Sequence, residues 1–261
     1  MKFFDSHAHY WDSRFLSETE AGVDALLTSL FKDSVSGIVN VGTNLETTML
    51  SISQAKRFPG MYVAGGIHPG DIPEGATVDA LEETWTPLFK CAENKLVALG
   101  EIGLDYHYTP FDKARQMEFF EAQMLLAEKL SLPVIIHDRE AHGDCFDMIR
   151  RFPNVTGIFH SYSGSAEMAK ALVARGYKIS FSGTVSFKNA RNVKEAALAV
   201  PKESILIETD APYLTPHPYR GRLNHSGYLF YTAQAIAELW ETDVSEVARI
   251  TEENARALFK L

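Results

Sequence analysis

The sequence is poor in cysteine and has neither a long apolar run nor an excess of basic residues. Two cysteines, Cys91 and Cys145, cannot form a disulfide framework, and free thiols are typical of cytosolic proteins. No stretch approaches the ~20 apolar residues that a membrane span needs. The first residues lack the apolar segment and small-residue cleavage site of a signal peptide. We therefore expect a cytoplasmic protein that makes no membrane contact.

Linkers, low-complexity tracts and two common enzyme motifs are also absent. Because no Ser/Gly-rich linker divides the chain, we expect residues 1–261 to form one domain, and we expect a monomer. There is no Gly-x-Ser-x-Gly elbow and no Walker-type glycine loop, which argues against a serine hydrolase and an NTPase. The net charge of −9 argues against a protein that coats nucleic acid, but it leaves room for an enzyme with a small basic patch.

Short apolar or β-branched runs alternate with longer amphipathic segments, such as a predicted helix over Lys113–Leu130. Eight strand-helix repeats favour a parallel sheet closed into a TIM (β/α)8 barrel, a fold of about 250 residues, with a doubly wound open sheet as the alternative. The expected strands are Lys2–Asp5, Gly37–Val41, Met61–Ala64, Leu96–Leu99, Pro133–Ile136, Gly157–Phe159, Lys178–Phe181 and Ile205–Ile207.

The last part of the chain differs from these repeats. Residues after Tyr228 have a helical pattern with a break near Glu241–Asp243. Residues 211–226 have no periodicity and contain Pro212, Pro216 and Pro218, which predicts a long loop after the eighth strand. Long ordered loops in compact domains are often functional.

Metal-ligating residue types recur at the carboxyl ends of five expected strands, where a TIM barrel places its active site. A lone His-x-His such as His7 and His9 is more often two surface histidines. Several histidines and carboxylates buried at one barrel end would be costly without a cation, however. The predicted metal ligands are His7, His9, Glu101, His137, His160 and Asp210.

This ligand set also predicts the kind of metal centre. Imidazole and carboxylate together suit Zn, Mn, Fe or Co better than Ca or Mg. Six ligands exceed the four of a tetrahedral site, which favours two divalent cations bridged by a carboxylate, with Zn, Mn, Mg or a similar ion left open. Asp210 is the expected general base, and Glu101 is the other expected catalytic residue. Asp5 and Asp105 are candidates for orienting the ligand imidazoles.

Basic residues follow the fifth, seventh and eighth expected strands, and many barrels hold phosphate beyond the last two strands. For any single one of them, ordinary surface charge is the better interpretation. His68, after the third strand, faces the substrate in one interpretation and is a turn histidine in the other. The basic residues that follow these strands are Arg139, Lys188, Arg191, Arg220 and Arg222.

Five ordered motifs give the chain a family resemblance. They are DSHAH at residues 5–9, GIHP at 66–69, GEIGLDY at 100–106, FHSYSG at 159–164 and ETDAPYL at 208–214. These motifs resemble the signatures of the TatD family of metal-dependent hydrolases. The resemblance implies a TIM barrel of the amidohydrolase superfamily, two divalent metals and deoxyribonuclease activity. It also implies that Glu101 bridges a first metal on His7, His9 and Asp210 to a second on His137 and His160.

The resemblance implies DNA as the substrate, as single strands or strand ends, with Arg222 and Asn224 at the substrate mouth. The family usually has Arg-x-Asn-Glu-Pro there, whereas this chain has His225 and Ser226 in place of the Glu and Pro. Two alternatives remain open. One is a metal-dependent hydrolase of a small amide, ester or lactone on the same site. The other is a non-enzymatic scaffolding protein with a vestigial site.

Overall fold

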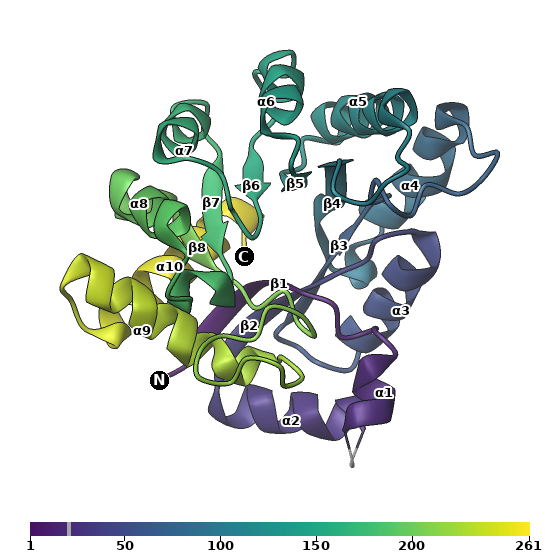
Figure 1. Cartoon of the computed structure of the whole chain (residues 1–261). Coiled ribbons are helices and arrows are strands. Elements are labelled where there is room, and N and C mark those ends of the chain that lie inside the picture. Colours follow the sequence, from purple (N-terminus) through teal and green to yellow (C-terminus); the bar gives the residue numbers. More distant parts are fainter. Residues whose placement is uncertain (20–21) are drawn as a thin grey trace.

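Eight parallel strands lie side by side in chain order in the computed structural model, which describes residues 1–19 and 22–261 (Figure 1). Every neighbouring pair is parallel, so all eight carboxyl ends face the same side. The strands are β1 (Phe3–Ala8), β2 (Val35–Val41), β3 (Met61–Gly65), β4 (Leu96–Asp105), β5 (Val134–Arg139), β6 (Gly157–Phe159), β7 (Lys178–Phe181) and β8 (Ile205–Ile207).

The first and last strands meet just beyond their carboxyl ends. Ala8 forms a parallel bridge with Ala211. The N–H of His9 donates to the Ala211 carbonyl at 2.7 Å, and the N–H of Asp210 donates to the His7 carbonyl at 2.9 Å. The sheet is therefore a nearly closed barrel, which confirms the predicted TIM barrel over the open sheet.

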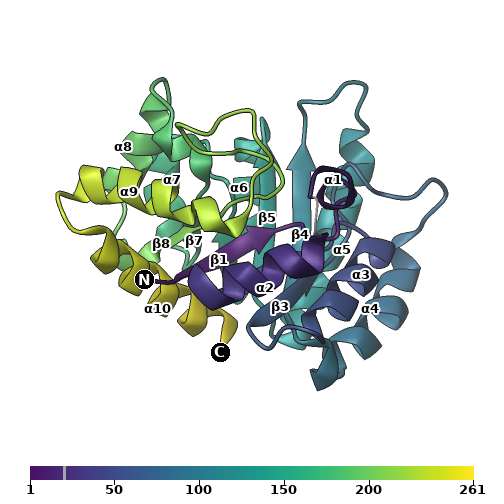
Figure 2. The ribbon, with the colours of Figure 1, turned by 90° about the horizontal axis from the view of Figure 1, so that it is seen from below.

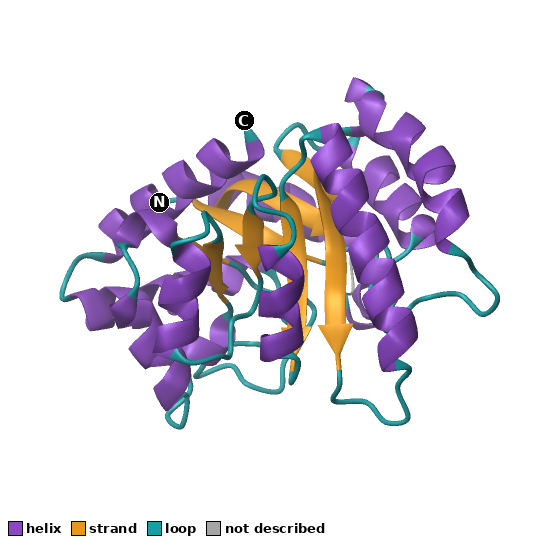
Figure 3. Ribbon diagram, turned by 90° about the horizontal axis from the view of Figure 1, so that it is seen from above, coloured by secondary structure: helices purple, strands orange, loops and turns teal. Residues whose placement is uncertain are grey.

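Helices surround the barrel and return the chain from one strand to the next (Figures 1 and 2). The strands lie inside this ring, and Figure 3 shows them between two groups of helices. The helices are α1 (Arg14–Glu18), α2 (Val23–Asp33), α3 (Leu45–Ala55), α4 (Leu81–Lys90), α5 (Lys113–Leu130), α6 (His142–Arg150), α7 (Ala166–Val173), α8 (Arg191–Ala199), α9 (Leu229–Trp240) and α10 (Val244–Phe259).

The strands are buried on both faces, as barrel strands must be when side chains fill the interior and helices cover the outside. In β2, for example, every residue except Ser36 is buried. This explains why the strands read as short continuous apolar runs. No helix of the described residues is long and apolar enough to span a membrane.

Helix α5 has the predicted bounds, because its ends are marked locally. The Asp112 side chain accepts a hydrogen bond from the Arg115 N–H at 3.0 Å, and Ser131 ends the helix in a left-handed conformation. The tail after Tyr228 forms α9 and α10, with the break where it was predicted.

Strands β1, β4 and β5 continue beyond their predicted ends, to Ala8, Asp105 and Arg139. The pairing of β4 with β5 resumes at Ile102 after an irregularity. Glu101 therefore lies inside a strand and not after it. The residues that follow β8 form the predicted loop, which ends at the short helix η5 (Ser226–Tyr228).

Candidate metal centre

Six buried or largely buried side chains converge at the carboxyl end of the barrel. They come from five strands that are far apart in sequence. His7 and Glu101 lie within β1 and β4, and His137 lies within β5. His9, His160 and Asp210 follow β1, β6 and β8 by one to three residues. The structure thus brings together all six predicted ligands.

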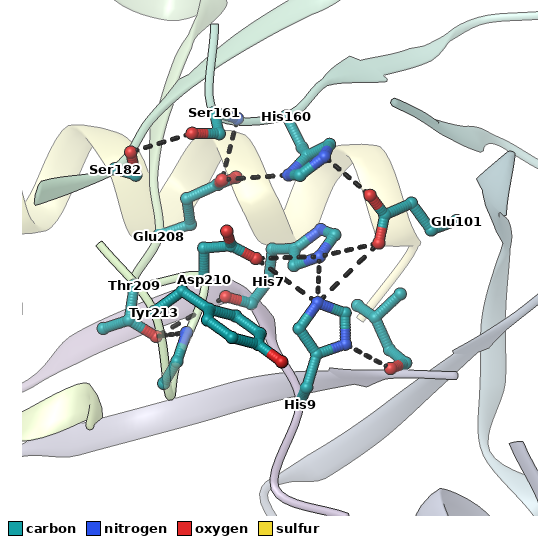
Figure 4. A network of polar contacts seen from close by, with 12 residues as sticks. His7, His9, Glu101, His160, Ser161, Ser182, Glu208, Thr209, Asp210 and Tyr213 are labelled. Carbon is teal, nitrogen blue, oxygen red and sulfur yellow. Dashed lines mark hydrogen bonds and ion pairs between the residues drawn. The ribbon is translucent and has the colours of Figure 1, made fainter. Parts of the chain in front are cut away.

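One group of atoms surrounds the space between β1, β4 and β8 (Figure 4). The Nε2 atoms of His7 and His9 are 3.0 Å apart. Glu101 Oε2 lies 3.4 Å from His7 Nε2 and 3.7 Å from His9 Nε2. Asp210 Oδ1 lies 3.6 Å and 3.3 Å from the same two nitrogens. Four ligand atoms therefore face one another across a space of atomic size.

A second group forms around the other oxygen of Glu101. Glu101 Oε1 lies 2.7 Å from His137 Nδ1 and 2.8 Å from His160 Nε2. These two nitrogens are 3.2 Å apart. Glu101 therefore directs one carboxylate oxygen at each pair of histidines, which is the arrangement of a bridging ligand.

The first group has dimensions that suit a cation. Ligand atoms around a tetrahedral Zn²⁺, with bonds of about 2.1 Å, lie roughly 3.4 Å from one another. The distances in the first group, from 3.0 to 3.7 Å, bracket this value. His7, His9 and Glu101 form one cluster that could hold a metal ion, and Glu101, His137 and His160 form another.

The rings of His9 and His137 are oriented by hydrogen bonds on the side away from the centre. His9 Nδ1 lies 2.7 Å from the Val41 carbonyl. His137 Nε2 lies 3.0 Å from Asp105 Oδ2, which supports the predicted orienting role of Asp105. Such partners set which nitrogen keeps its lone pair for a metal.

Glu208 orients His160, a contact that the sequence did not reveal. Its Oε1 lies 3.3 Å from His160 Nδ1 and accepts a hydrogen bond from the Ser161 N–H at 2.7 Å (Figure 4). The sequence leaves two interpretations of Glu208, one facing away from the Asp210 site and one supporting that site indirectly, and its contact with His160 favours the second.

Asp5, by contrast, contacts no ligand ring. Its carboxylate accepts hydrogen bonds from the Thr209 N–H and hydroxyl at 3.0 and 2.7 Å and from the Ser226 hydroxyl at 2.6 Å. Burial raises the pKa of Asp5 to about 7, although these hydrogen bonds act in the opposite direction. Asp5 thus ties β1 to the segment after β8 and so positions Asp210.

The electrostatics of the centre favour added positive charge. Burial alone would raise the pKa of Glu101, but the charges of His160 and His7 hold it well below its usual value. Burial would also lower the pKa of His160, but Glu101 keeps it well above its usual value. Burial and His160 together lower the pKa of His7. The imidazoles cannot all be protonated side by side, whereas a cation would satisfy carboxylates and neutral imidazoles together.

The residues predicted to contact substrate do not lie together at one place, unlike the predicted metal ligands. His68 lies at the centre, with Nε2 3.8 Å from Glu101 Oε1 and its ring 4.3 Å from that of His137. Arg139 lies over the exposed Tyr108 ring at 4.8 Å. Lys188 is exposed in the loop after β7. Arg222 lies over Tyr219 at 5.3 Å in the loop after β8.

Asn224 is fully buried and its amide is occupied by the main chain. The side-chain amide donates to the carbonyls of Thr209 and Tyr213 at 2.9 and 2.6 Å. Its oxygen accepts from the His225 N–H at 2.9 Å. In this structure Asn224 holds the loop after β8 in shape instead of lining an open surface.

Comparisons with known proteins agree on one family. Residues 4–260 match the family model described as "TatD related DNase". The chain is 38% identical over 262 residues to an uncharacterized metal-dependent hydrolase, YabD, of Bacillus subtilis, covering 99% of both. It is 33% identical to another, YcfH, of Escherichia coli K12, covering 100% of this chain and 97% of that protein. The structure of YjjV, a TatD homologue from E. coli K12, superposes with a TM-score of 0.89 at 28% identity, covering 99% of this chain and 98% of that one.

Proposed function

Because this chain belongs to the TatD family of metal-dependent hydrolases, we propose that it hydrolyses phosphodiester bonds of DNA, in single strands or at strand ends. Two divalent cations would be held at the carboxyl end of the barrel. The residues assigned to the first are His7, His9, Glu101 and Asp210, and those assigned to the second are Glu101, His137 and His160.

The observation that carries this proposal is the division of Glu101 between two histidine pairs. Oε2 faces His7 and His9, while Oε1 faces His137 and His160. A single metal would leave one pair of buried imidazoles facing a carboxylate oxygen without a cation. Zn, Mn or a similar ion fits the mixture of imidazole and carboxylate best.

Cations bound here would supply Lewis acidity, lowering the pKa of water and neutralising charge on phosphate oxygens. We assign to Asp210 the role of accepting the proton of the attacking water. Burial alone would raise the pKa of Asp210, but the hydrogen bond from His9 and the charge of His7 lower it. Asp210 is therefore an ionised carboxylate near neutral pH, as a base must be.

Substrate contact is assigned to residues around this centre. His68 lies beside Glu101, and the guanidinium groups of Arg139 and Arg222 are available at the end of β5 and in the loop after β8. Lys188 extends from the loop after β7. Cations that pair with phosphate oxygens and aromatic rings that stack on bases are the usual means of binding single strands.

The alternative function is hydrolysis of a small amide, ester or lactone at the same metal centre. The net charge of −9 favours this alternative, because overall negative charge repels a polyanion.

A cytoplasmic location is supported by the two cysteines, both of which are free thiols.

Turnover after metal stripping and add-back tests the proposal. The substrates are labelled single-stranded DNA, bis(p-nitrophenyl) phosphate and a panel of lactones, small esters and amides. We expect DNA cleavage to disappear with a chelator and to return with Mn or Zn. Glu101→Gln, purified in parallel, controls for contaminating nuclease and should stay inactive. Lactone or amide turnover without cleavage of any phosphodiester would establish the alternative instead.

A further inference from the structure

A second binding site lies between the loops that follow β7 and β8. The cavity measures about 470 Å³ and opens at the same barrel end as the metal centre, because both loops leave the carboxyl ends of their strands. It is lined by Phe187, Lys188, Asn189, Ala190, His217 and Arg220.

The lining combines cations with an aromatic surface and has no carboxylate. The Arg220 guanidinium lies 4.2 Å from the centre of the Phe187 ring. Within the described parts of the chain, neither Lys188 nor Arg220 forms an ion pair. Several other exposed arginines are neutralised, as in the pairs of Arg57 with Asp24 and of Arg249 with Glu246. In a chain with a net charge of −9, two unpaired cations in one cavity indicate an anionic ligand.

The two walls of the cavity are fixed to each other. The His217 N–H donates to the Ser186 hydroxyl at 2.8 Å, and this hydroxyl donates to the Gly183 carbonyl at 2.6 Å. A Cβ atom at Gly183 would lie 2.1 Å from the Leu214 carbonyl oxygen, so the two loops are in direct backbone contact. The cavity is therefore a formed site between ordered loops.

The same loops connect this cavity to the metal centre. Ser182, which precedes the wall segment, shares a hydrogen bond of 2.9 Å with the Ser161 hydroxyl (Figure 4). The Ser161 N–H in turn donates to Glu208, the residue that orients His160. On the other wall, Asp210 begins the loop that carries Arg220. The cavity and the metal centre are therefore joined through the same two loops at one end of the barrel.

We propose that this cavity binds a nucleotide of single-stranded DNA beyond the one whose phosphodiester is cleaved. A base stacks on the platform of Phe187 and Arg220, and Lys188 and Arg220 pair with its phosphate. Stacking on a ring or guanidinium plane accepts any base, because every base has a π-face. The subsite rests on the proposed function, since it extends the same substrate.

A series of thymidine oligonucleotides of increasing length tests the subsite. The holoenzyme should bind better as the strand grows long enough to reach the cavity, which is seen as a falling KM. In Arg220→Ala and Lys188→Gln this gain should shrink. In each of these variants, we expect the ratio of kcat/KM for the long oligonucleotide to kcat/KM for bis(p-nitrophenyl) phosphate to fall about 10-fold below that of the wild type. The slope of oligonucleotide binding against salt concentration should also decrease.

Arg150→Ala is the matched control. Arg150 is an exposed arginine in the last turn of α6, at the opposite end of the barrel, and it forms an ion pair with Asp147 of its own helix. This variant should show the full length dependence. If the wild type cleaves DNA and both Arg220→Ala and Lys188→Gln keep its length dependence, the subsite alone is overturned. Absence of any phosphodiester turnover would overturn the proposed function and the subsite with it.

Discussion

Asp210 has two tasks in the proposed reaction, as a metal ligand beside His7 and His9 and as proton acceptor. Asparagine can keep part of the first task and none of the second. We expect Asp210→Asn to remain folded and to lose kcat by about 10²–10⁴-fold, the usual worth of a general base. Steady-state kinetics together with the melting temperature measure this.

The control for Asp210 is His160→Ala, which removes a ligand of the second cation and no base. Its activity should be partly rescued by excess cation, whereas that of Asp210→Asn should not. A folded, metallated Asp210→Asn with wild-type kcat would show that another group accepts the proton.

Glu208 acts on the centre through His160 and does not itself reach the proposed cations. Replacing it with glutamine keeps its size but weakens the acceptor for His160 Nδ1. We expect Glu208→Gln to lower the affinity for one of two bound metals by about 10–100-fold and to leave the other nearly unchanged. Metal titration followed by calorimetry measures both sites. Equal weakening of both sites would contradict the assignment of His160 to one cation only.

The close contact between the loops after β7 and β8 depends on one glycine, Gly183. At Gly183 a Cβ would approach the Leu214 carbonyl oxygen to 2.1 Å and Pro216 N to 2.8 Å, both main-chain atoms. We expect Gly183→Ala to destabilise the protein by about 1–3 kcal/mol, because the loops must separate. Urea denaturation measures the loss.

Gly143→Ala is the matched substitution for Gly183→Ala. Gly143 is exposed in α6 and has no atom within 4 Å of the added methyl group. Alanine there should leave stability unchanged or raise it by up to about 1 kcal/mol, since it favours the helix. If both variants lost the same stability, the contact between the loops would not be the cause.

For the whole molecule, cation binding and folding are coupled, because the ligands come from both ends of the chain. His7 lies in β1 and Asp210 after β8, so an unfolded chain offers no formed site. A cation at 100 times its Kd stabilises the folded state by about 2.7 kcal/mol. For a chain of this size, that corresponds to a Tm rise of roughly 5–11 °C. Calorimetry of chelated and reloaded protein measures it, and Glu101→Gln should show a much smaller shift.

Much of the fold was predictable because its signals are local. A barrel strand is apolar on both faces, so the strands were recognisable as short buried runs, and five of them match the structure closely. Strands β1, β4 and β5 continue beyond their predicted ends, because polar residues such as Ser6, Glu101 and Asp138 interrupt the apolar pattern although the strands go on. The parallel order then placed the residues that follow each strand at the same barrel end, which is why the predicted ligands do converge.

The barrel, the end at which its polar residues gather, and the residue types available to a metal therefore follow from the sequence. Which atoms face each other depends on the tertiary structure. Asp5 meets Thr209 and Ser226, 204 and 221 residues away, and Glu208 meets His160 from another strand. Asn224 is buried against the main chain, and Phe187 and Arg220 form a cavity from two loops. Such partners depend on closure of the barrel, whereas periodicity and hydrophobicity report only on neighbours along the chain.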